Sequence, residues 1–177
     1  MTSLPDTIYY DEISSPVGTL RLVADSRGLC EVCFERERHP KQAHAGWVRA
    51  AAPLAFARVQ LEQYFAGERQ QFELPLHPVG TPFQRAVWDE LGRIPYGVTI
   101  SYSELARRID KPLAVRAVGA ANGRNPLPIV LPCHRVIGSD GSLTGFGGGL
   151  PTKRFLLMLE HAMPAGDLFD GTLLDQP

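Results

Sequence analysis

The chain has 177 residues, of which 44% are hydrophobic and 21% are charged, and its formal net charge is −1. This composition supports a packed core and excludes an extensively disordered chain, and the longest apolar runs are far too short to cross a bilayer. The first residues lack the basic and apolar regions of a signal peptide, so we expect a cytoplasmic protein.

Charge and cysteine content narrow the possible partners and compartment. The net charge is −2 over residues 1–79, +4 over residues 80–164 and −3 over residues 165–177. A contact with nucleic acid is therefore expected in the second half, although a charge of +4 is modest. The three cysteines, Cys30, Cys33 and Cys133, cannot all pair with one another, which in the cytosol indicates reduced thiols and a candidate reactive one.

The first third of the chain is predicted to form strands. Residues 7–14, 19–24 and 29–34 are short runs of β-forming residues separated by turn-forming residues. A helix is expected over residues 53–66, with Ala57, Leu61 and Tyr64 toward the core and Gly67 at its end. The proline-rich residues 74–82 are interpreted as an interdomain linker.

The second half is predicted to be helical. Residues 82–91 begin with a proline and carry apolar residues at helical spacing. Ser101 and Glu104 have the spacing of a capping box at the start of a short helix, which residues 110–112 break before a further helix over 113–122. This outline fits a helix-turn-helix, and a plain helical hairpin fits the spacing equally well. A final helix is expected over residues 152–161.

One segment carries the strongest chemical signal. Pro126, Pro128 and Pro132 fix the backbone shortly before Cys133 and so reduce the entropic cost of positioning it. The adjacent His134 and Arg135 predict a positive field that favours the nucleophilic thiolate. A water or a turn would have to connect His134 to the thiol, because neighbouring residues of an extended chain point to opposite sides. For an isolated Cys-His pair, a buried inert cysteine is the more common situation.

The same segment resembles a known family. Asn125-Pro126 and Pro132-Cys133-His134-Arg135-Val136 resemble the active-site signature of the O6-alkylguanine-DNA alkyltransferases. The resemblance covers nearly all of the second half and is weak in the first third. It lies in residues 83–88, 94–97, 101–106, 116–122, 125–136 and 145–160, and in residues 15–18 and 28–29. The resemblance implies that Cys133 is a reactive rather than a structural cysteine.

The resemblance implies a reaction and a set of catalytic residues. Cys133 would accept the alkyl group from O6 of guanine, and from O4 of thymine, in a single irreversible turnover without a cofactor. His134 would act through water as the base, and Glu160 would orient it. Asn125 would hold the turn that carries Cys133. Tyr102 would donate a hydrogen bond or a proton to the departing guanine.

The substrate pocket follows from the same resemblance. It would be lined by Tyr102, Val136, Phe146, Gly147 and Gly148. Glycines suit a loop whose backbone must approach a flat base closely. Some relatives carry tyrosine and serine where this chain has Phe146 and Gly147, so the tolerance for bulky alkyl groups is expected to differ.

The helix over residues 113–122 is the expected DNA contact. Its small side chains suit a minor groove only about 6 Å wide, which is the groove that family members use, and the damaged nucleotide must be flipped out of the duplex. Arg116 would fill the vacated position in the base stack. The expected DNA-binding residues are Ala114, Arg116, Ala117, Gly119 and Ala120. The partner is therefore double-stranded DNA and not a membrane, bound by a monomer whose cooperative assembly on DNA stays open.

Some relatives bind zinc in the first domain, and Cys30, Cys33 and His77 are candidate ligands. Cys30 and Cys33 lie three residues apart on a predicted strand and point opposite ways, and a closed set of four ligands is not evident. We therefore expect structural thiols and no metal site.

The fold class is α+β. We expect a small N-terminal mixed α/β domain over residues 1–78, ribonuclease-H-like by resemblance, a mainly helical C-terminal domain with a helix-turn-helix over 79–164, and an acidic tail over 165–177.

Three other functions compete with alkyl transfer: a non-enzymatic lesion-binding protein that recruits repair factors, a Cys-His hydrolase and an alkylation-sensing regulator. Lesion-binding proteins of this kind lack the acceptor cysteine, whereas Cys133 is present here. A Cys-His hydrolase would leave the small-residue helix without a function.

Overall fold

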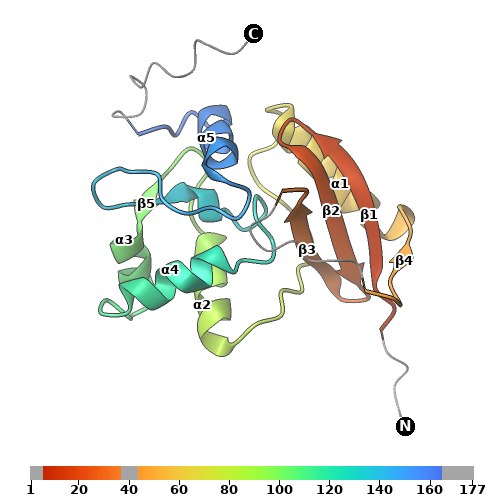
Figure 1. Ribbon diagram of the computed structural model, residues 1–177, viewed down its shortest axis with the longest axis horizontal. Helices are drawn as coiled ribbons and strands as arrows, with labels where there is room; N and C mark the ends of the chain where they lie inside the picture. The colour runs from red at the N-terminus through yellow and green to blue at the C-terminus, as the bar shows by residue number, and fades with distance from the viewer. Residues whose placement is uncertain (1–5, 37–43, 165–177) are drawn as a thin grey trace.

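The structure is a computed structural model that describes residues 6–36 and 44–164. The predicted acidic tail lies outside the described residues. A sheet with one long helix forms one half of the molecule, and a group of shorter helices forms the other half (Figure 1). Mixed α and β elements in separate halves confirm the predicted fold class. No helix in the described part of the chain is long and apolar enough to span a membrane.

The sheet contains the three predicted strands, β1 (Tyr9–Ser15), β2 (Gly18–Asp25) and β3 (Gly28–Phe34), each within about two residues of its expected bounds. A fourth, unpredicted strand, β4 (Val48–Arg49), gives the order β3-β2-β1-β4. The β2–β3 turn is fixed by Asp25, whose Oδ1 accepts the amides of Arg27 and Gly28. The end of this turn requires glycine. Gly28 has φ +153°, and a Cβ at this position would lie 2.4 Å from the backbone oxygen of Pro75.

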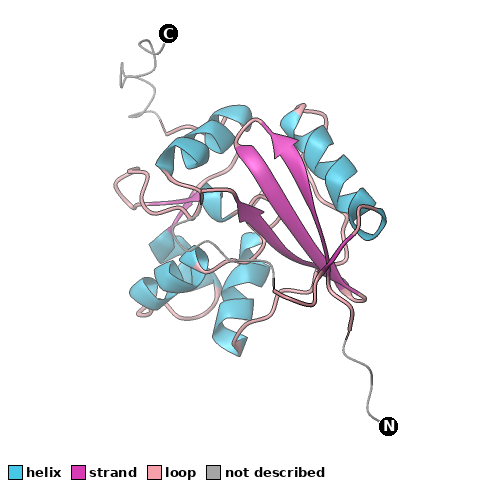
Figure 2. Ribbon diagram, turned by 45° about the vertical axis from the view of Figure 1, so that its right-hand side comes forward, coloured by secondary structure: helices cyan, strands magenta, loops and turns pink. Residues whose placement is uncertain are grey.

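The predicted helix of the first half begins as a 3₁₀ turn, η1 (Ala52–Leu54), and continues as α1 (Ala55–Phe65). Its buried face contains Ala57, Leu61 and Tyr64, as predicted. Arg58, which is half-buried, donates to Asp11 of β1 at 3.4 Å. Figure 2 shows α1 lying along the strands, with the helical half beyond the other side of the sheet.

The helical half follows the predicted order. It contains α2 (Pro82–Leu91), α3 (Tyr102–Arg108), α4 (Val115–Gly123) and α5 (Leu150–Leu159). Between these helices lie β5 (Ile100–Ser101), the 3₁₀ turn η2 (Cys133–Arg135) and β6 (Val136–Ile137), with β5 and β6 paired in parallel. This pair was not predicted, because strands of two residues leave no recognisable pattern in the sequence.

One helix start differs in detail from the prediction. The Ser101 hydroxyl accepts the Glu104 amide at 3.1 Å, as expected for a cap. The Glu104 carboxylate instead pairs with Arg107 and Arg108 on its own helix, so the reciprocal half of a capping box is not formed. A full capping box is found at α2, between Thr81 and Gln84.

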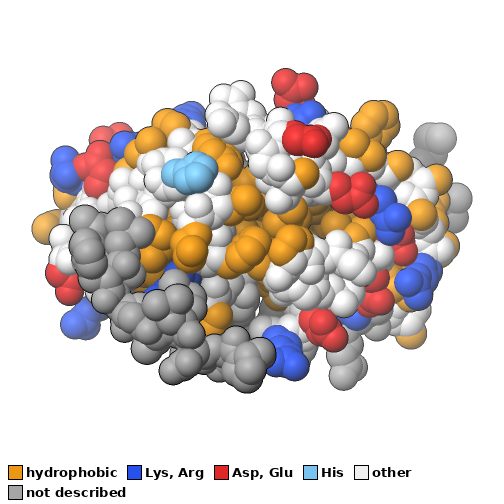
Figure 3. Space-filling view, turned by 90° about the horizontal axis from the view of Figure 1, so that it is seen from above, with side chains coloured by type: hydrophobic (Ala, Val, Ile, Leu, Met, Phe, Trp, Pro, Cys, Tyr) orange, Lys and Arg blue, Asp and Glu red, His pale blue; other side chains and the backbone are white. Residues whose placement is uncertain are grey.

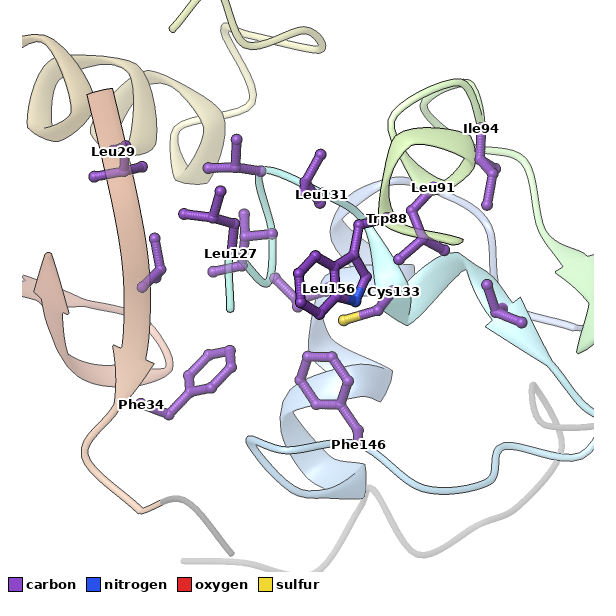
Figure 4. Packing of buried hydrophobic residues seen from close by; sticks show 14 of the residues in the cluster. Leu29, Phe34, Trp88, Leu91, Ile94, Leu127, Leu131, Cys133, Phe146 and Leu156 are labelled. Carbon is purple, nitrogen blue, oxygen red and sulfur yellow. The ribbon is translucent and has the colours of Figure 1, made fainter. Parts of the chain in front are cut away.

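The two halves share one continuous core and meet at β3. The outer edge of β3 is covered by two segments, since Leu29 exchanges backbone hydrogen bonds with Pro75 and His77, and the Val32 amide donates to the Pro126 carbonyl at 2.9 Å. Covered edges do not pair with other chains. Hydrophobic residues of both halves pack together at this junction (Figure 4). Seen from above, a band of hydrophobic side chains also follows the middle of the molecule, where the halves meet (Figure 3).

Candidate active site

The turn before Cys133 is held by Asn125. Its side-chain nitrogen donates to the Leu131 carbonyl at 2.7 Å, and its side-chain oxygen accepts the Leu127 amide at 2.9 Å. The turn also contains Ile129 with φ +75°, a conformation that a β-branched residue rarely adopts. Such strain persists only where the surroundings enforce it. The Asn125 side chain therefore closes a rigid loop, from Asn125 to Leu131, that ends two residues before the thiol.

Cys133 is the first residue of η2 and is only 5% exposed. It lies on the wall of a cavity of about 720 Å³, within the size range of ligand pockets. Figure 4 shows its sulfur pointing toward Phe146. Both halves of the molecule contribute lining: Val32, Cys33 and Phe34 come from β3, Tyr102 from α3, Gly119, Ala120, Asn122 and Gly123 from α4, and Arg124, Asn125, Pro126, Pro128, Thr144, Gly145, Phe146 and Gly147 from loops.

His134 is fully buried and is oriented by Glu160. Its Nε2 lies 2.7 Å from Glu160 Oε1. A carboxylate only accepts hydrogen bonds, so Nε2 carries the proton and Nδ1 of the neutral ring is an acceptor. That Nδ1 is buried and has no hydrogen-bond partner among the described residues. The structure therefore brings His134 and Glu160 together as predicted, and leaves one ring nitrogen available to accept a proton.

Glu160, which caps the C-terminus of α5, connects the two halves. Its carboxylate accepts the Tyr64 hydroxyl of α1 at 2.6 Å and two nitrogens of Arg135 at 2.8 and 3.0 Å. Burial raises the pKa of this carboxyl, but the hydrogen bonds from His134 and Arg135 outweigh burial and hold the pKa at about 2. Glu160 is therefore ionised at neutral pH and can stabilise a positive charge on His134.

The electrostatics around the thiol differ from the expected positive field. The Arg135 side chain points away to Glu160 and to the Ile94 carbonyl, which it contacts at 2.6 Å. Burial raises the pKa of the Cys133 thiol, with a partial offset from Asn125 and the charge of Lys153. Burial also lowers the pKa of His134. The expected thiolate is corrected to a neutral thiol beside a neutral histidine, because desolvation disfavours both charged forms.

Tyr102 stands at the start of α3 and is half-buried. Its hydroxyl donates to the Thr144 carbonyl at 3.3 Å. The same carbonyl accepts the ammonium of Lys153 at 2.9 Å, and Lys153 also donates to the Val136 carbonyl at 2.6 Å. Lys153 is fully buried, and burial lowers its pKa to about 8. The lysine thus fixes two carbonyls beside the cavity.

Of the other residues expected in the pocket, two line the cavity and two do not. Phe146 and Gly147 line the cavity together with Tyr102, and the Phe146 ring meets the Phe34 ring of β3 edge-on at 5.5 Å. Val136 and Gly148 are not among the lining residues. The Val136 side chain is fully buried in the core, and Gly148 lies against Phe34, where a Cβ would come within 2.9 Å of the ring.

The expected DNA-binding residues lie on α4 and just before it. Ala117 and Ala120 are exposed, Ala114 and Gly119 are half-buried, and Gly119 and Ala120 reach the cavity. Arg116 is exposed and forms no ion pair with a described residue. A long unpaired cation on a surface of small residues, next to the cavity, is the arrangement that the sequence predicted.

The zinc candidates are only partly brought together. Cys30 and His77 meet Asp25 with ligand atoms within 4.8 Å of one another, while Cys33 faces the cavity. Three donors do not form a closed four-ligand site, and they already bond among themselves: His77 Nδ1 lies 2.8 Å from Asp25. Burial raises the pKa of Cys30 to about 11, which keeps it a thiol. This donor set fits a hydrogen-bonded cluster better than a structural zinc site.

Sequence reasoning missed four polar residues near Cys133: Tyr64, Asn122, Arg135 as a partner of Glu160, and Lys153. One signal was available for Lys153, because it precedes the fully buried Leu156 and Leu157 by three and four residues on α5. Tyr64 could not be found from sequence, because it meets Glu160 across 96 positions.

Comparison with known proteins agrees with this geometry. Residues 8–78 match the ribonuclease-like domain of 6-O-methylguanine DNA methyltransferase, and residues 82–162 match its DNA-binding domain. The methylated-DNA–protein-cysteine methyltransferase of Methanosarcina barkeri is 48% identical over 87% of this chain and 98% of its own length. The enzyme of that name from Mycobacterium tuberculosis is 46% identical over 95% of this chain and 99% of its own.

Solved structures agree as well. The Mycobacterium tuberculosis OGT in complex with DNA has a TM-score of 0.82 and 44% identity, covering 90% of this chain and 97% of that one. The O6-methylguanine-DNA methyltransferase of Pyrococcus kodakaraensis shares the fold at 24% identity, with a TM-score of 0.61 over 87% of this chain and 99% of that one.

The fold and the buried Cys-His-Glu site together define a cysteine-dependent transferase of DNA repair. The chain belongs to the O6-methylguanine-DNA methyltransferase family. Its activity is that of a methylated-DNA–protein-cysteine methyltransferase, and it binds DNA and repairs alkyl damage in it.

Proposed function

We propose that Cys133 accepts the alkyl group from O6 of guanine, and from O4 of thymine, in duplex DNA, and that each chain reacts once. The observation that carries this proposal is a buried thiol on the wall of an open cavity, directly followed by a histidine whose Nδ1 is unpartnered and whose Nε2 is held by Glu160. A nucleophile, a base and an orienting carboxylate form the usual arrangement for activating a thiol.

The chemistry balances without a cofactor. The thiol proton passes to His134 Nδ1 through a bridging water, and Glu160 stabilises the resulting imidazolium. The thiolate attacks the alkyl carbon, so a C–S bond forms as the C–O6 bond breaks and guanine leaves with the electron pair. Tyr102 donates a hydrogen bond to the departing base, which stabilises its developing negative charge. A thioether is a poor leaving group, so the product stays on Cys133 and turnover ends.

Access to the base requires nucleotide flipping, because an atom inside the duplex cannot reach a buried thiol. The small residues of α4 are proposed to enter the minor groove beside the cavity, with Arg116 filling the position that the flipped base leaves. The unpaired, exposed state of Arg116 supports this role. We propose a monomer in solution as the active form, which sedimentation at working concentration tests.

The decisive experiment weighs the intact protein after incubation with duplex DNA that contains O6-methylguanine or O6-benzylguanine. One alkyl mass per chain is expected, on the peptide that contains Cys133, and the reaction should stop at one equivalent. A parallel duplex with O4-methylthymine tests the second lesion. Sustained turnover would contradict the single-reaction mechanism, and DNA binding with no added mass would favour a lesion-binding protein instead.

A further inference from the structure

Asn122 is a buried polar residue of the cavity wall that the reaction described above does not use. It lies on the last turn of α4, is 4% exposed, and lines the cavity together with Tyr102 and Cys133. Its side-chain oxygen has no hydrogen-bond partner among the described residues. An unpartnered buried amide costs stability, and an apolar side chain of similar size would avoid that cost. Stability therefore does not explain an asparagine at this position.

Asn122 and Tyr102 line the same cavity, and the Asn122 side chain is one of the groups that act on the Tyr102 phenol. The Tyr102 ring packs along α4, because a Cβ on Gly119, one turn before Asn122, would lie 3.8 Å from it. Burial raises the pKa of Tyr102, while hydrogen bonding from Thr144 and from the Asn122 side chain acts in the opposite direction. The phenol therefore donates to the Thr144 carbonyl and shares the cavity wall with the Asn122 amide.

Lys153 allows the phenol to change its acceptor. The bond from Tyr102 to the Thr144 carbonyl is 3.3 Å long, whereas good O–H···O bonds measure about 2.5–3.0 Å. The Lys153 ammonium holds the same carbonyl at 2.9 Å. If the hydroxyl turns to a substrate atom, the carbonyl therefore keeps its stronger donor and no buried acceptor is left unpaired.

We propose that Asn122 is a positioning residue for Tyr102. Its amide N–H donates to the phenolic oxygen while the phenol proton is donated to the departing base. A donor on the phenolic oxygen polarises the O–H bond and strengthens the hydrogen bond to the base as negative charge develops there. Asn122 then accelerates the chemical step through Tyr102 without touching the base. This inference rests on the proposed alkyl transfer and on the role of Tyr102 in it.

The test is a double-mutant cycle of Asn122→Leu and Tyr102→Phe, read as single-turnover rate constants with O6-benzylguanine as the free base. Asn122→Leu should slow transfer about 10-fold in the wild-type background, a typical size for a hydrogen bond that acts in the transition state. In the Tyr102→Phe background the same substitution should change the rate by less than about twofold, because the hydroxyl through which Asn122 acts is absent. Equal losses in both backgrounds, or no loss in the wild type, would overturn the proposal.

Two further measurements separate positioning from a structural role. Asn122→Leu should melt at the same or a higher temperature than the wild type, and its Cys133 should react with iodoacetamide at the wild-type rate. Gln60→Leu is the matched control, since this buried amide of α1 bonds the Glu73 backbone with both polar atoms. It should lower the melting temperature and leave transfer unchanged. Iodoacetamide alkylation slowed in step with transfer would assign Asn122 to the cavity's shape and reject the proposal.

The failure of the proposed function would look different from the failure of this inference. If the protein does not transfer alkyl groups to Cys133, the wild type itself adds no mass with either the duplex or the free base. If only the inference is wrong, the wild type reacts and the cycle shows additive losses.

Discussion

Cys33 and Cys133 lie on two walls of the same cavity, and the two thiols differ in their polar surroundings. On β3, Cys33 is part of a regular strand, and its thiol donates to the Glu31 carboxylate at 3.6 Å. At η2, Cys133 follows the loop closed by Asn125 and precedes His134, with Lys153 supplying a nearby positive charge. Both thiols are buried, so burial does not distinguish them. The polar partners do.

The largest expected effect comes from replacing Cys133, and the other two cysteines serve as controls. Cys133→Ala should abolish alkyl transfer and keep binding to alkylated duplex, because the cavity and α4 remain. Cys33→Ala and Cys30→Ala should transfer at close to the wild-type rate. Intact mass and a gel-shift titration measure the two properties. Mass added at Cys33 or Cys30 in the Cys133→Ala variant at a comparable rate would show that the polar partners do not select the thiol.

Glu160→Gln should have the next largest effect. Removing the orienting carboxylate of a serine protease costs about 10⁴ in rate, and a smaller loss, of roughly 10², is expected here because a thiol ionises more easily than a hydroxyl. DNA affinity should change little. Glu62→Gln, at an exposed carboxylate of α1, serves as the control. An unchanged transfer rate would remove Glu160 from the mechanism.

The same carboxylate should make stability depend on acid. The pKa of Glu160 is about 2 in the folded protein against 4.5 for an unperturbed glutamate, so the unfolded chain binds the proton first. Its contribution to stability is complete above about pH 4.5 and is lost as pH falls toward 2. Urea unfolding between pH 6 and 3 should therefore show a weaker pH dependence in Glu160→Gln than in the wild type. Parallel curves would contradict the assigned pKa.

Arg116, on the surface of α4 beside the cavity, has two possible roles in DNA binding that predict different results. If Arg116 fills the gap of a flipped base, Arg116→Ala should slow repair of duplex DNA, by tenfold or more for an unstacking cost of a few kcal/mol, and spare the free alkylated base. If it contacts only phosphate, the slope of log affinity against log salt should fall by about one. Arg69→Ala, in the other half of the molecule, is the control. Equal losses on duplex and free base would place Arg116 in the pocket or the fold.

The smallest expected effect concerns the buried Lys153. Its pKa is about 8 in the folded protein against 10.5 for an unperturbed lysine, so between these values the unfolded chain binds more protons. The stability of the wild type relative to Lys153→Met should therefore rise with pH from about 8 to 10.5. Urea unfolding of both proteins across that range measures the difference. A relative stability that falls with pH would show that the ammonium is better solvated than its burial indicates.

The sequence predicted the elements of the fold more completely than their assembly. Runs of β-forming residues between turns predicted β1, β2 and β3, helical spacing predicted α1 and α2, and breaking residues at both ends predicted α4, because these signals are local in the chain. The strand order, the two-residue strands β4 to β6 and the contact of Pro126 with β3 were not predictable. These features depend on contacts between segments that are distant in the chain, and such contacts produce no repeating pattern of residues in either segment. The domain boundaries at residues 78 and 164 stay a prediction.

The candidate site divides in the same way. Cys133, His134 and Asn125 form a local motif, so their identities could be read from a dozen consecutive residues. Glu160 and Tyr102 came from resemblance alone. Tyr64 and Asn122 were missed because nothing in their local sequence shows what they face, whereas the helical spacing of Lys153 to Leu156 and Leu157 was a signal that was not used.

The sequence by itself determined which thiol is the candidate acceptor and which helix has side chains small enough to approach DNA. Only the tertiary structure decided the protonation of the site. Burial keeps the Cys133 thiol and His134 neutral, and contacts from α1, η2 and the end of α5 keep Glu160 ionised. Charge states depend on desolvation and on neighbours brought from distant parts of the chain, and neither quantity is encoded in the order of adjacent residues.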